Sequence, residues 1–294
     1  YEIIKHMPKR SHPMDVARTA VSVMGLEDKE TTDSSPEANM RKALRIFAKT
    51  PTALAAFYRI RKGKKIIKPK KNLTFAENFF YMCFGKVPQK EIVKAFDVSL
   101  ILYAEHSFNV STFTARTITS SLSDIHGAIT GAIASLKGPL HGGANEEVMH
   151  MMNRIKKPEN ALKWINNALK NKEVVMGFGH RVYKSGDSRV PTMRKYFGKV
   201  AKLKKDKKFE KIYDIVEKVM IKKKNIHPNV DYPTGPTYHL MGFDTDFFTP
   251  IFVISRITGW SAHIMEQHAA NKLIRPLASY KGSKHRKVME LNYR

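Results

Sequence analysis

Two histidines of this sequence stand in glycine-rich turns, where an imidazole could act on a bound substrate. His141 lies in G-P-L-H-G-G-A-N-E-E, between an apolar segment that ends at Gly138-Pro139 and a new helical pattern. At a helix start, free N–H groups and the positive end of the helix dipole disfavour a protonated ring. We therefore expect a neutral His141 that donates a hydrogen bond, and Gly142 and Gly143 would let the backbone approach a ligand. An ordinary loop histidine is the alternative interpretation.

The second histidine lies in M-G-F-G-H-R-V-Y-K-S-G-D-S-R, residues 176–189. Gly177 and Gly179 expose backbone N–H groups, and cations follow in the same short loop, which makes it a natural site for an anion. A tight turn with solvated cations is the alternative, because G-x-G alone is weak evidence. The basic side chains of this segment are His180, Arg181, Lys184 and Arg189.

Two further residues could take part in the chemistry: the carboxylate Asp231 and Arg256, an arginine within an apolar helix. Asp231 precedes a new helix in N-V-D-Y-P-T-G, where it could be a catalytic base or, as its ordinary role, the cap of that helix. Arg256 lies in the helical segment 247–268, and a buried cation without a partner is costly. Either a distant acid or an anionic ligand must neutralise it. No carboxylate stands three or four positions away, where the residues are Phe252, Val253, Gly259 and Trp260.

Histidines in turns, one carboxylate and several arginines suit chemistry on a small polycarboxylate. Arg275 follows the last apolar helix, where exposure is the ordinary expectation. The sequence shows no spacing of metal ligands, no G-x-S-x-G turn and no Walker loop.

Helices must position these residues, because apolar side chains recur at helical spacing and strand signals are almost absent. The longest β-like run, Val174–Phe178, is short and enters a glycine turn. Segment 125–136 is small and apolar nearly all round, which is typical of a buried helix with close neighbours. We therefore predict an all-α fold. Helices are expected at about 11–25, 37–60, 75–84, 88–104, 125–136, 143–154, 158–171, 191–204, 207–224 and 247–268.

The composition is that of a globular protein with an unusual positive charge. With 294 residues the chain can bury a sizeable core, and no apolar run reaches the length of a membrane span. The single cysteine, Cys83, lies in an apolar stretch, so disulfides are excluded and a reducing compartment is expected. A charge of +26 would attract polyanions. The lysines are mixed with acids and lack arginine–aromatic interleaving, which favours a solvated surface over a nucleic-acid site.

Four segments, in this order, resemble the citrate synthase family. Three are G-P-L-H-G-G-A-N-E, G-F-G-H-R-V-Y-K-S-G-D-S-R and P-N-V-D, and the fourth is F-T-P-I-F-V-I-S-R-I-T-G-W-S-A-H-I-M-E-Q, which leads to I-R-P. L-Y-A-E-H-S-F-N-V-S-T-F-T-A-R, residues 102–116, is most similar to the subgroup that contains the 2-methylcitrate synthases. The resemblance runs from about Ser11 to Tyr280. Family members normally carry a further N-terminal segment, which we expect to be missing here.

For the fold, this resemblance implies an all-α protomer of two domains in a tight homodimer. Residues 1–142 with 243–294 would form the large helical domain, and residues 143–242 a small domain on the CoA side. The small domain would close over the ligands, since carbanion chemistry needs dry, preorganised surroundings. We expect a cytoplasmic protein that binds small molecules and neither membranes nor nucleic acid.

For the chemistry, the resemblance implies condensation of propionyl-CoA or acetyl-CoA with oxaloacetate, and thioester hydrolysis to 2-methylcitrate or citrate plus CoA. Asp231 would take the proton next to the thioester carbonyl, neutral His141 would hold the enol oxygen, and His180 would act as acid toward the oxaloacetate carbonyl. Acyl-CoA is a co-substrate, and no permanently bound cofactor and no metal are implied. Oxaloacetate would be bound by His106, Arg189, Arg256 and, from the other subunit, Arg275, with Gly177, Gly179 and Lys184 on the CoA side.

Other functions remain open from the sequence. A non-catalytic basic protein on the same fold could bind polyanions, although such a protein would have no need of His141, His180 and Asp231 together. A lyase could run the cleavage direction with the same residues. The acyl group is also undecided, since one methylene is worth only about 1 to 3 kcal/mol in a pocket. The wording of the motifs favours 2-methylcitrate synthase.

Overall fold

The computed structural model describes residues 1–138, 141–179, 183, 185–284 and 287–293. Regular structure in these residues is helical, and the predicted all-α fold is confirmed. The β-like run Val174–Phe178 does not become a strand. Phe178 instead pairs with Pro228 in an isolated antiparallel bridge.

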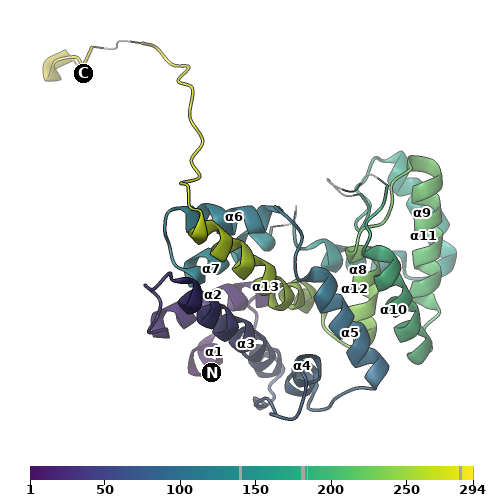
Figure 1. Ribbon diagram of the computed structural model, residues 1–294. Coiled ribbons are helices and arrows are strands. Elements are labelled where there is room, and N and C mark those ends of the chain that lie inside the picture. Colours follow the sequence, from purple (N-terminus) through teal and green to yellow (C-terminus); the bar gives the residue numbers. More distant parts are fainter. Residues whose placement is uncertain (139–140, 180–182, 184, 285–286, 294) are drawn as a thin grey trace.

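One group of helices comprises α1 to α7 and the late helix α13, which pack together on one side of the molecule (Figure 1). Helix α13 contacts α2, α3, α5, α6 and α7, and its Ile254, Ile257 and Trp260 are fully buried. This long apolar helix is therefore the core around which the group is built. The bounds are Glu2–His6 (α1), Pro13–Glu27 (α2), Pro36–Arg61 (α3), Phe75–Phe84 (α4), Lys90–Tyr103 (α5), Val110–Ser120 (α6), Ile125–Leu136 (α7) and Phe248–Ala269 (α13).

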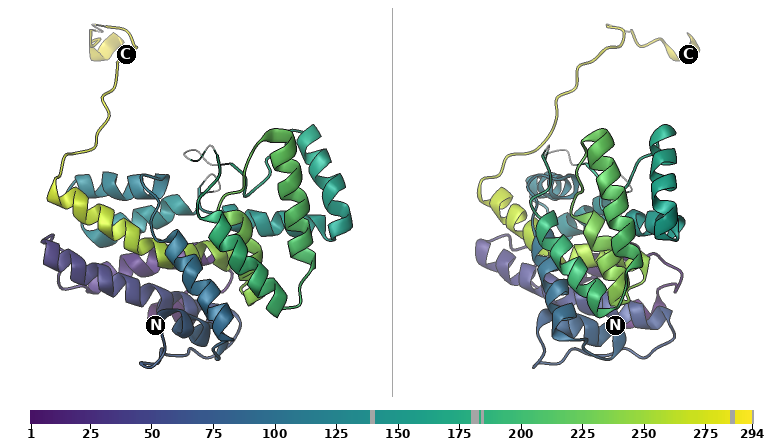
Figure 2. Two further views of the ribbon diagram at one scale, coloured as in Figure 1. Left: turned by 45° about the vertical axis from the view of Figure 1, so that its right-hand side comes forward. Right: turned by 90° about the vertical axis from the view of Figure 1, so that its right-hand side faces the viewer.

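A second group comprises the helices between α7 and α13, and Figure 2 turns it toward the viewer. Helix α12 packs between α8 and α10, and α11 packs against α9. Helix α5 of the first group contacts both α10 and α12, so its end lies where the two groups meet. The bounds are Ala144–Ile155 (α8), Pro158–Lys170 (α9), Val190–Leu203 (α10), Lys208–Lys224 (α11) and Asp231–Met241 (α12), followed by the 3-10 turn η1, Thr245–Phe247.

Helix α7 is the small apolar segment that the sequence predicted to be buried. Its Ile125, Ile129 and Ile133 are fully buried. A Cβ at Gly131 would lie 2.1 Å from Cδ1 of Ile118 on α6, so the glycine allows the two helices to pack closely. This pair of helices holds the turn that follows α7.

The chain leaves the helical body after α13. The described residues beyond Ala269 are mostly extended and exposed, apart from the short 3-10 turn η2, Leu291–Tyr293, and they reach away from the other helices (Figure 1). The segment is attached where it starts, because the Ile274 N–H donates to the Ser120 hydroxyl at 3.0 Å. Arg275 follows directly and is exposed.

Cys83 is a core residue, as predicted, and only 2% of it is exposed on α4. Burial raises the pKa of its thiol well above the usual range. None of the helices described here combines the length and apolar character needed to cross a membrane.

Candidate active site

His141 lies in the turn that enters α8. The Gly142 N–H donates to the Leu136 carbonyl at 3.0 Å, and the His141 N–H donates to the Gly138 carbonyl at 2.9 Å. A Cβ at Gly142 would lie 2.2 Å from the Leu136 carbonyl oxygen. Only glycine fits this position, so the end of α7 and the start of α8 together fix the place of the imidazole.

The imidazole of His141 has a defined tautomer. Its Nε2 accepts a hydrogen bond from the Ser111 backbone N–H at 3.1 Å, and the Ser111 hydroxyl oxygen lies 2.9 Å from the same nitrogen. An amide N–H can only donate, so Nε2 presents its lone pair and the proton of the neutral ring is on Nδ1. Burial, with a smaller contribution from the charge of Arg256, lowers the pKa of His141 to about 4. The ring is therefore neutral at pH 7 and can donate from Nδ1.

Ser111 is itself held from two sides. Its hydroxyl donates to Oδ1 of Asn109 at 2.8 Å and accepts from Nε1 of Trp260 at 3.2 Å. The Asn109 side chain caps α6 by accepting from the Thr112 N–H at 3.1 Å. Ser111 orients His141, and Ser111 is itself held in place by Asn109 at the start of α6 and by Trp260 in α13.

Asp231 is the first residue of α12, and it does not cap that helix, whose N-cap is Val230. The Tyr103 hydroxyl, at the end of α5, instead donates to Oδ1 of Asp231 at 2.5 Å. Asp231 keeps some accessible surface, yet protein groups surround its carboxyl closely. Burial raises its pKa, and the Tyr103 hydrogen bond and the charge of Arg189 offset part of that rise. A carboxylate with a raised pKa is a stronger base than an exposed one.

Arg189 is held by an aspartate that the sequence analysis did not single out. Its Nε and Nη2 donate to the two carboxylate oxygens of Asp187, at 2.9 and 2.8 Å. Oδ2 of Asp187 also accepts from the Val230 N–H at 3.0 Å. The Asp187 side chain therefore joins the arginine to the residue directly before Asp231, and it fixes both.

Arg256 is 2% exposed and forms no ion pair within the described part of the chain. Its Nε donates to the Tyr103 carbonyl at 2.6 Å, and its guanidinium carbon lies 4.5 Å from the centre of the Phe252 ring. Burial, with repulsion from Arg189, lowers the pKa of Arg256 to about 10, so the cation remains charged at pH 7. The sequence predicted a distant acid or an anionic ligand as its partner. The structure shows a helix carbonyl as the direct partner, and Glu105 and Asp231 act on Arg256 only through their charges.

The end of α5 gathers both arginines. Unpaired carbonyls at a helix end carry partial negative charge. Arg256 binds the Tyr103 carbonyl, and Nη1 of Arg189 lies 3.5 Å from that of Leu102. Gly259 lets α13 approach closely, because a Cβ there would lie 2.4 Å from the Ala104 carbonyl oxygen. Arg189 is paired with Asp187, whereas the direct partner of Arg256 is only a carbonyl, so this helix end can offer a cation to a small anion.

His106 follows the end of α5 and is partly buried. Its ring meets that of Tyr183 edge to face, with ring centres 5.4 Å apart. Tyr183 therefore reaches the α5–α6 connection, where His106 follows the helix end that both arginines contact.

Gly177 and Gly179 form a tight turn with left-handed backbone angles, φ 82° and 79°. The Gly179 N–H donates to the His227 carbonyl, and the Asn229 N–H donates to the Gly177 carbonyl, each at 2.9 Å. A Cβ at Gly177 would lie 2.7 Å from Cγ2 of Val148 on α8. The turn is thus anchored to the segment before Asp231 and to α8.

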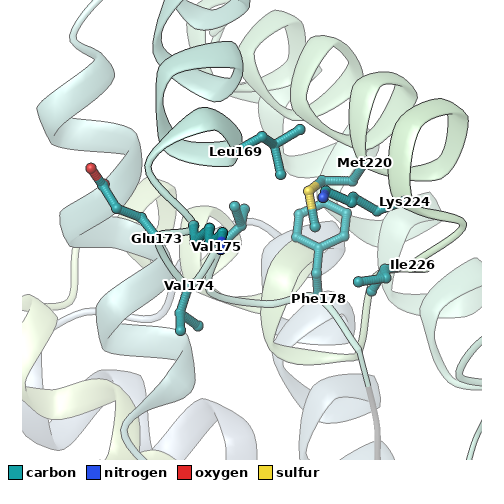
Figure 3. Close-up of a pocket in the computed structure, with 9 residues that line it drawn as sticks. Leu169, Glu173, Val174, Val175, Phe178, Met220, Lys224 and Ile226 are labelled. Atoms are coloured by element: carbon teal, nitrogen blue, oxygen red, sulfur yellow. The ribbon is translucent and has the colours of Figure 1, made fainter.

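Beside this turn lies a hollow of about 320 Å³ (Figure 3). Its floor is apolar, and Figure 3 shows the Phe178 ring together with Met220 and Ile226 on one side. Two lysines stand in the lining, which suits an apolar or aromatic group that carries negative charge. The lining residues are Leu169, Lys172, Glu173, Val174, Val175, Phe178, Met220, Lys224 and Ile226.

The structure thus brings most of the candidate residues into one region. His141 before α8, Arg189 before α10, Asp231 on α12 and Arg256 on α13 come together there, since Arg256 acts electrostatically on the other three. Arg275 of the same protomer lies on the extended C-terminal segment instead. His180 and Lys184 lie outside the described residues. No group of three or more His, Cys, Asp and Glu among the described residues could hold a metal ion.

Three residues of the site were missed by the sequence analysis. Tyr103 falls in the predicted helix 88–104 and in the segment 102–116, but nothing local signals its contact with Asp231, which is 128 positions away. The partner of Arg189, Asp187, is two residues away, so the signal was in the sequence. Ser111 acts through its backbone, which no side-chain pattern reveals.

The fold and site define an all-α enzyme whose candidate site, with two arginines, a carboxylate and a neutral histidine, suits a small polycarboxylate. The chain belongs to the citrate synthase family. Residues 1–277 match the family model described as citrate synthase, C-terminal domain.

Individual relatives agree with this assignment. A citrate synthase of Mycolicibacterium smegmatis is 52% identical over 98% of this chain and 76% of its own length. A 2-methylcitrate synthase of Mycobacterium tuberculosis is also 52% identical, over 97% of this chain and 72% of its own. Among solved structures, a ternary complex of Thermoplasma acidophilum citrate synthase with carboxymethyl coenzyme A and oxaloacetate has a TM-score of 0.90. The two chains are 33% identical, and the match covers 100% of this chain and 79% of the Thermoplasma acidophilum chain. None of these comparisons supports the non-catalytic alternative.

Proposed function

We propose that this chain condenses propionyl-CoA or acetyl-CoA with oxaloacetate and hydrolyses the thioester, giving 2-methylcitrate or citrate plus CoA. Membership of the citrate synthase family and similarity to enzymes of both names support this reaction. One structural observation carries the proposal: a neutral His141 and a buried Asp231 flank two arginines held at the end of α5.

The first step is removal of a proton from the carbon next to the thioester carbonyl. Oδ2 of Asp231 takes this proton, and the C–H electrons form the enol double bond. The Nδ1–H of His141 donates to the carbonyl oxygen, where negative charge develops. Because the pKa of His141 is about 4, the ring donates a hydrogen bond and keeps its proton.

The enol carbon then attacks the keto carbon of oxaloacetate. Arg189 and Arg256 would bind the oxaloacetate carboxylates, and the charge of Arg256 that the helix carbonyl leaves unneutralised favours this role. His106 would be a further ligand. His180 would protonate the developing alkoxide, a role that comes from the family resemblance alone. Water then hydrolyses the thioester and releases the CoA thiol.

The CoA molecule would lie along the second group of helices. Gly177, Gly179 and Lys184 are proposed to line its path, and the hollow beside Phe178 offers an apolar surface for an adenine ring with lysines for phosphates. No other cofactor and no metal are needed for this chemistry.

Domain closure would exclude water from the enol. We propose residues 143–242 as the smaller, moving domain and residues 1–142 with 243–294 as the larger one. Helices α8 to α12 pack mainly on one another, which supports that division. His141 stands directly before the first boundary, so closure would carry α8 and Asp231 together over oxaloacetate.

A homodimer is the proposed assembly. Helix α6 and its flanking residues expose apolar side chains, with Phe108 62%, Val110 60% and Phe113 51% exposed. Arg275 would complete the oxaloacetate site of a second copy. Light scattering should give a mass close to twice 33.6 kDa. We further propose a cytoplasmic location, which the buried single thiol of Cys83 suits.

The test is release of the CoA thiol with oxaloacetate plus each acyl-CoA, on one preparation. Faster turnover with propionyl-CoA would identify a 2-methylcitrate synthase, and faster turnover with acetyl-CoA a citrate synthase. A folded dimer that releases no CoA from either substrate would contradict the proposed function.

A further inference from the structure

Tyr103 contacts both Asp231, the proposed base, and Arg256, a proposed ligand of oxaloacetate. It is the last residue of α5, and it is 1% exposed. Its hydroxyl donates to Oδ1 of Asp231 at 2.5 Å, and its backbone carbonyl accepts from Nε of Arg256 at 2.6 Å. Its ring packs against that of Phe252, with centres 4.3 Å apart, so the side chain has little freedom to move.

Several charges act on Asp231, and one described side chain donates a hydrogen bond to its carboxylate. Arg189 directly before α10, Asp187 in the same loop and Arg256 on α13 act on Asp231 electrostatically. Within the described part of the chain, Tyr103 is the only side chain that donates a hydrogen bond to its carboxylate. Oδ1 is therefore occupied, and Oδ2 is left for a substrate proton.

We propose that Tyr103 is a positioning residue for the base, which fixes the Asp231 carboxylate through Oδ1 and keeps it ionised while Oδ2 faces the carbon acid. This inference rests on the proposed function, in which Asp231 is the base. A carboxylate that could rotate would present the wrong lone pair for much of the time, and turnover would fall.

The Tyr103 hydroxyl also determines in which direction the pH dependence of activity should change. Burial raises the pKa of Asp231, and the Tyr103 hydrogen bond opposes that rise. Burial also raises the pKa of Tyr103 well above its usual value, so the proton stays on the tyrosine. Removal of the hydroxyl leaves the burial effect unopposed, so Asp231 protonates at a higher pH.

Tyr103→Phe tests the proposal because it removes the hydroxyl and keeps the carbonyl that holds Arg256. We expect kcat to fall by about tenfold to a hundredfold, as for the loss of a hydrogen bond to a charged group. The acidic limb of the kcat profile should move up by about one pH unit. The KM for oxaloacetate should stay within about twofold, because Arg256 keeps its contact.

Tyr238→Phe is the matched control. Tyr238 is equally buried at the contact of α12 with α5, and its hydroxyl lies 2.9 Å from the Ser99 hydroxyl; it acts on Asp231 through charge and not through a recorded hydrogen bond. A purely structural role for Tyr103 predicts that both variants lose thermal stability alike and that neither shifts the pH profile. The proposal predicts a shift for Tyr103→Phe alone.

The pH profile and the oxaloacetate affinity of Tyr103→Phe decide whether the proposal holds. An unshifted profile in Tyr103→Phe, or equal shifts in both variants, would overturn the proposal. Loss of oxaloacetate binding in Tyr103→Phe, measured by calorimetry, would also overturn it, because the hydroxyl would then matter beyond the base. An inactive wild-type chain would instead refute the proposed function, which keeps the two failures distinct.

Discussion

The Ser111 backbone N–H donates to Nε2 of His141 at 3.1 Å, so the main chain, rather than an acidic side chain, selects the tautomer of the proposed electrophile. His141→Ala should abolish condensation while oxaloacetate binding stays largely intact, because the arginines do not depend on the imidazole. Ser111→Ala is the control. It keeps the backbone N–H and should lose less than about tenfold in kcat. Equal losses in both variants would mean that the hydroxyl, and not the backbone, orients the ring.

The protonation of His141 can be followed directly. Since burial lowers its pKa to about 4, its ring NMR signals should stay at neutral values from pH 8 to about pH 5. His141→Ala identifies the signals by their disappearance. A midpoint near 6.5 would show that the ring is solvated, and it would remove the argument for a neutral donor.

The same pKa has a consequence for stability. Between about pH 6.5 and pH 4 the unfolded chain binds a proton at residue 141 that the folded chain does not bind. Protonation therefore favours the unfolded state, and His141 lowers the free energy of unfolding as the pH falls through this window. Urea titrations at pH 7 and pH 5 should show a smaller loss in a folded His141→Ala variant than in the wild type.

Arg256→Leu should weaken oxaloacetate binding by about a hundredfold or more, because it removes a charged partner of a carboxylate. Calorimetry with oxaloacetate alone measures this without turnover. Arg194→Leu is the matched control, since Arg194 pairs with Asp214 and Glu210 on α11 and does not contact the site. Unchanged oxaloacetate affinity in Arg256→Leu would show that Arg256 binds only the Tyr103 carbonyl at the end of α5 and does not bind oxaloacetate.

Gly235 lets α12, which starts with Asp231, approach α8, which follows His141. A Cβ at Gly235 would lie 2.7 Å from the Asn145 carbonyl oxygen, so Gly235→Ala should destabilise the protein by about 1 to 3 kcal/mol and lower kcat. Gly198→Ala on α10 meets only flexible side chains at 3.3 Å or more, and it should stabilise by up to about 1 kcal/mol. Thermal melts and kcat values of the two variants provide the comparison. Similar melting temperatures for both would contradict this view of the α8–α12 contact.

Much of the fold was readable from the sequence because helical periodicity is local. The burial of α7 and the turn before α8 followed from residue types within a dozen positions. Asp231 was different. Its position before a helix suggested a cap, and its actual partner, Tyr103, comes from a helix far back in the chain. Tertiary contact decides such a role, and one sequence does not display it.

Arg256 is a second residue whose contacts the sequence did not reveal. The apolar neighbours predicted a buried cation with no acid one helical turn away, and its burial is confirmed. The carbonyls at the end of α5 could not be predicted as its partner, because backbone groups have no sequence signature. The family motifs supplied the candidate residues, whereas the structure supplied what holds them.

Comparison of the wild type with Asp231→Asn tests directly whether Asp231 is the base of an acyl-CoA condensation. The wild type should release CoA in the presence of oxaloacetate. Asp231→Asn should lose at least about a thousandfold of this release, because the amide cannot accept the substrate proton, while oxaloacetate binding by calorimetry stays within a few fold. Near-normal CoA release by a folded Asp231→Asn variant would show that another group is the base, and it would contradict the account.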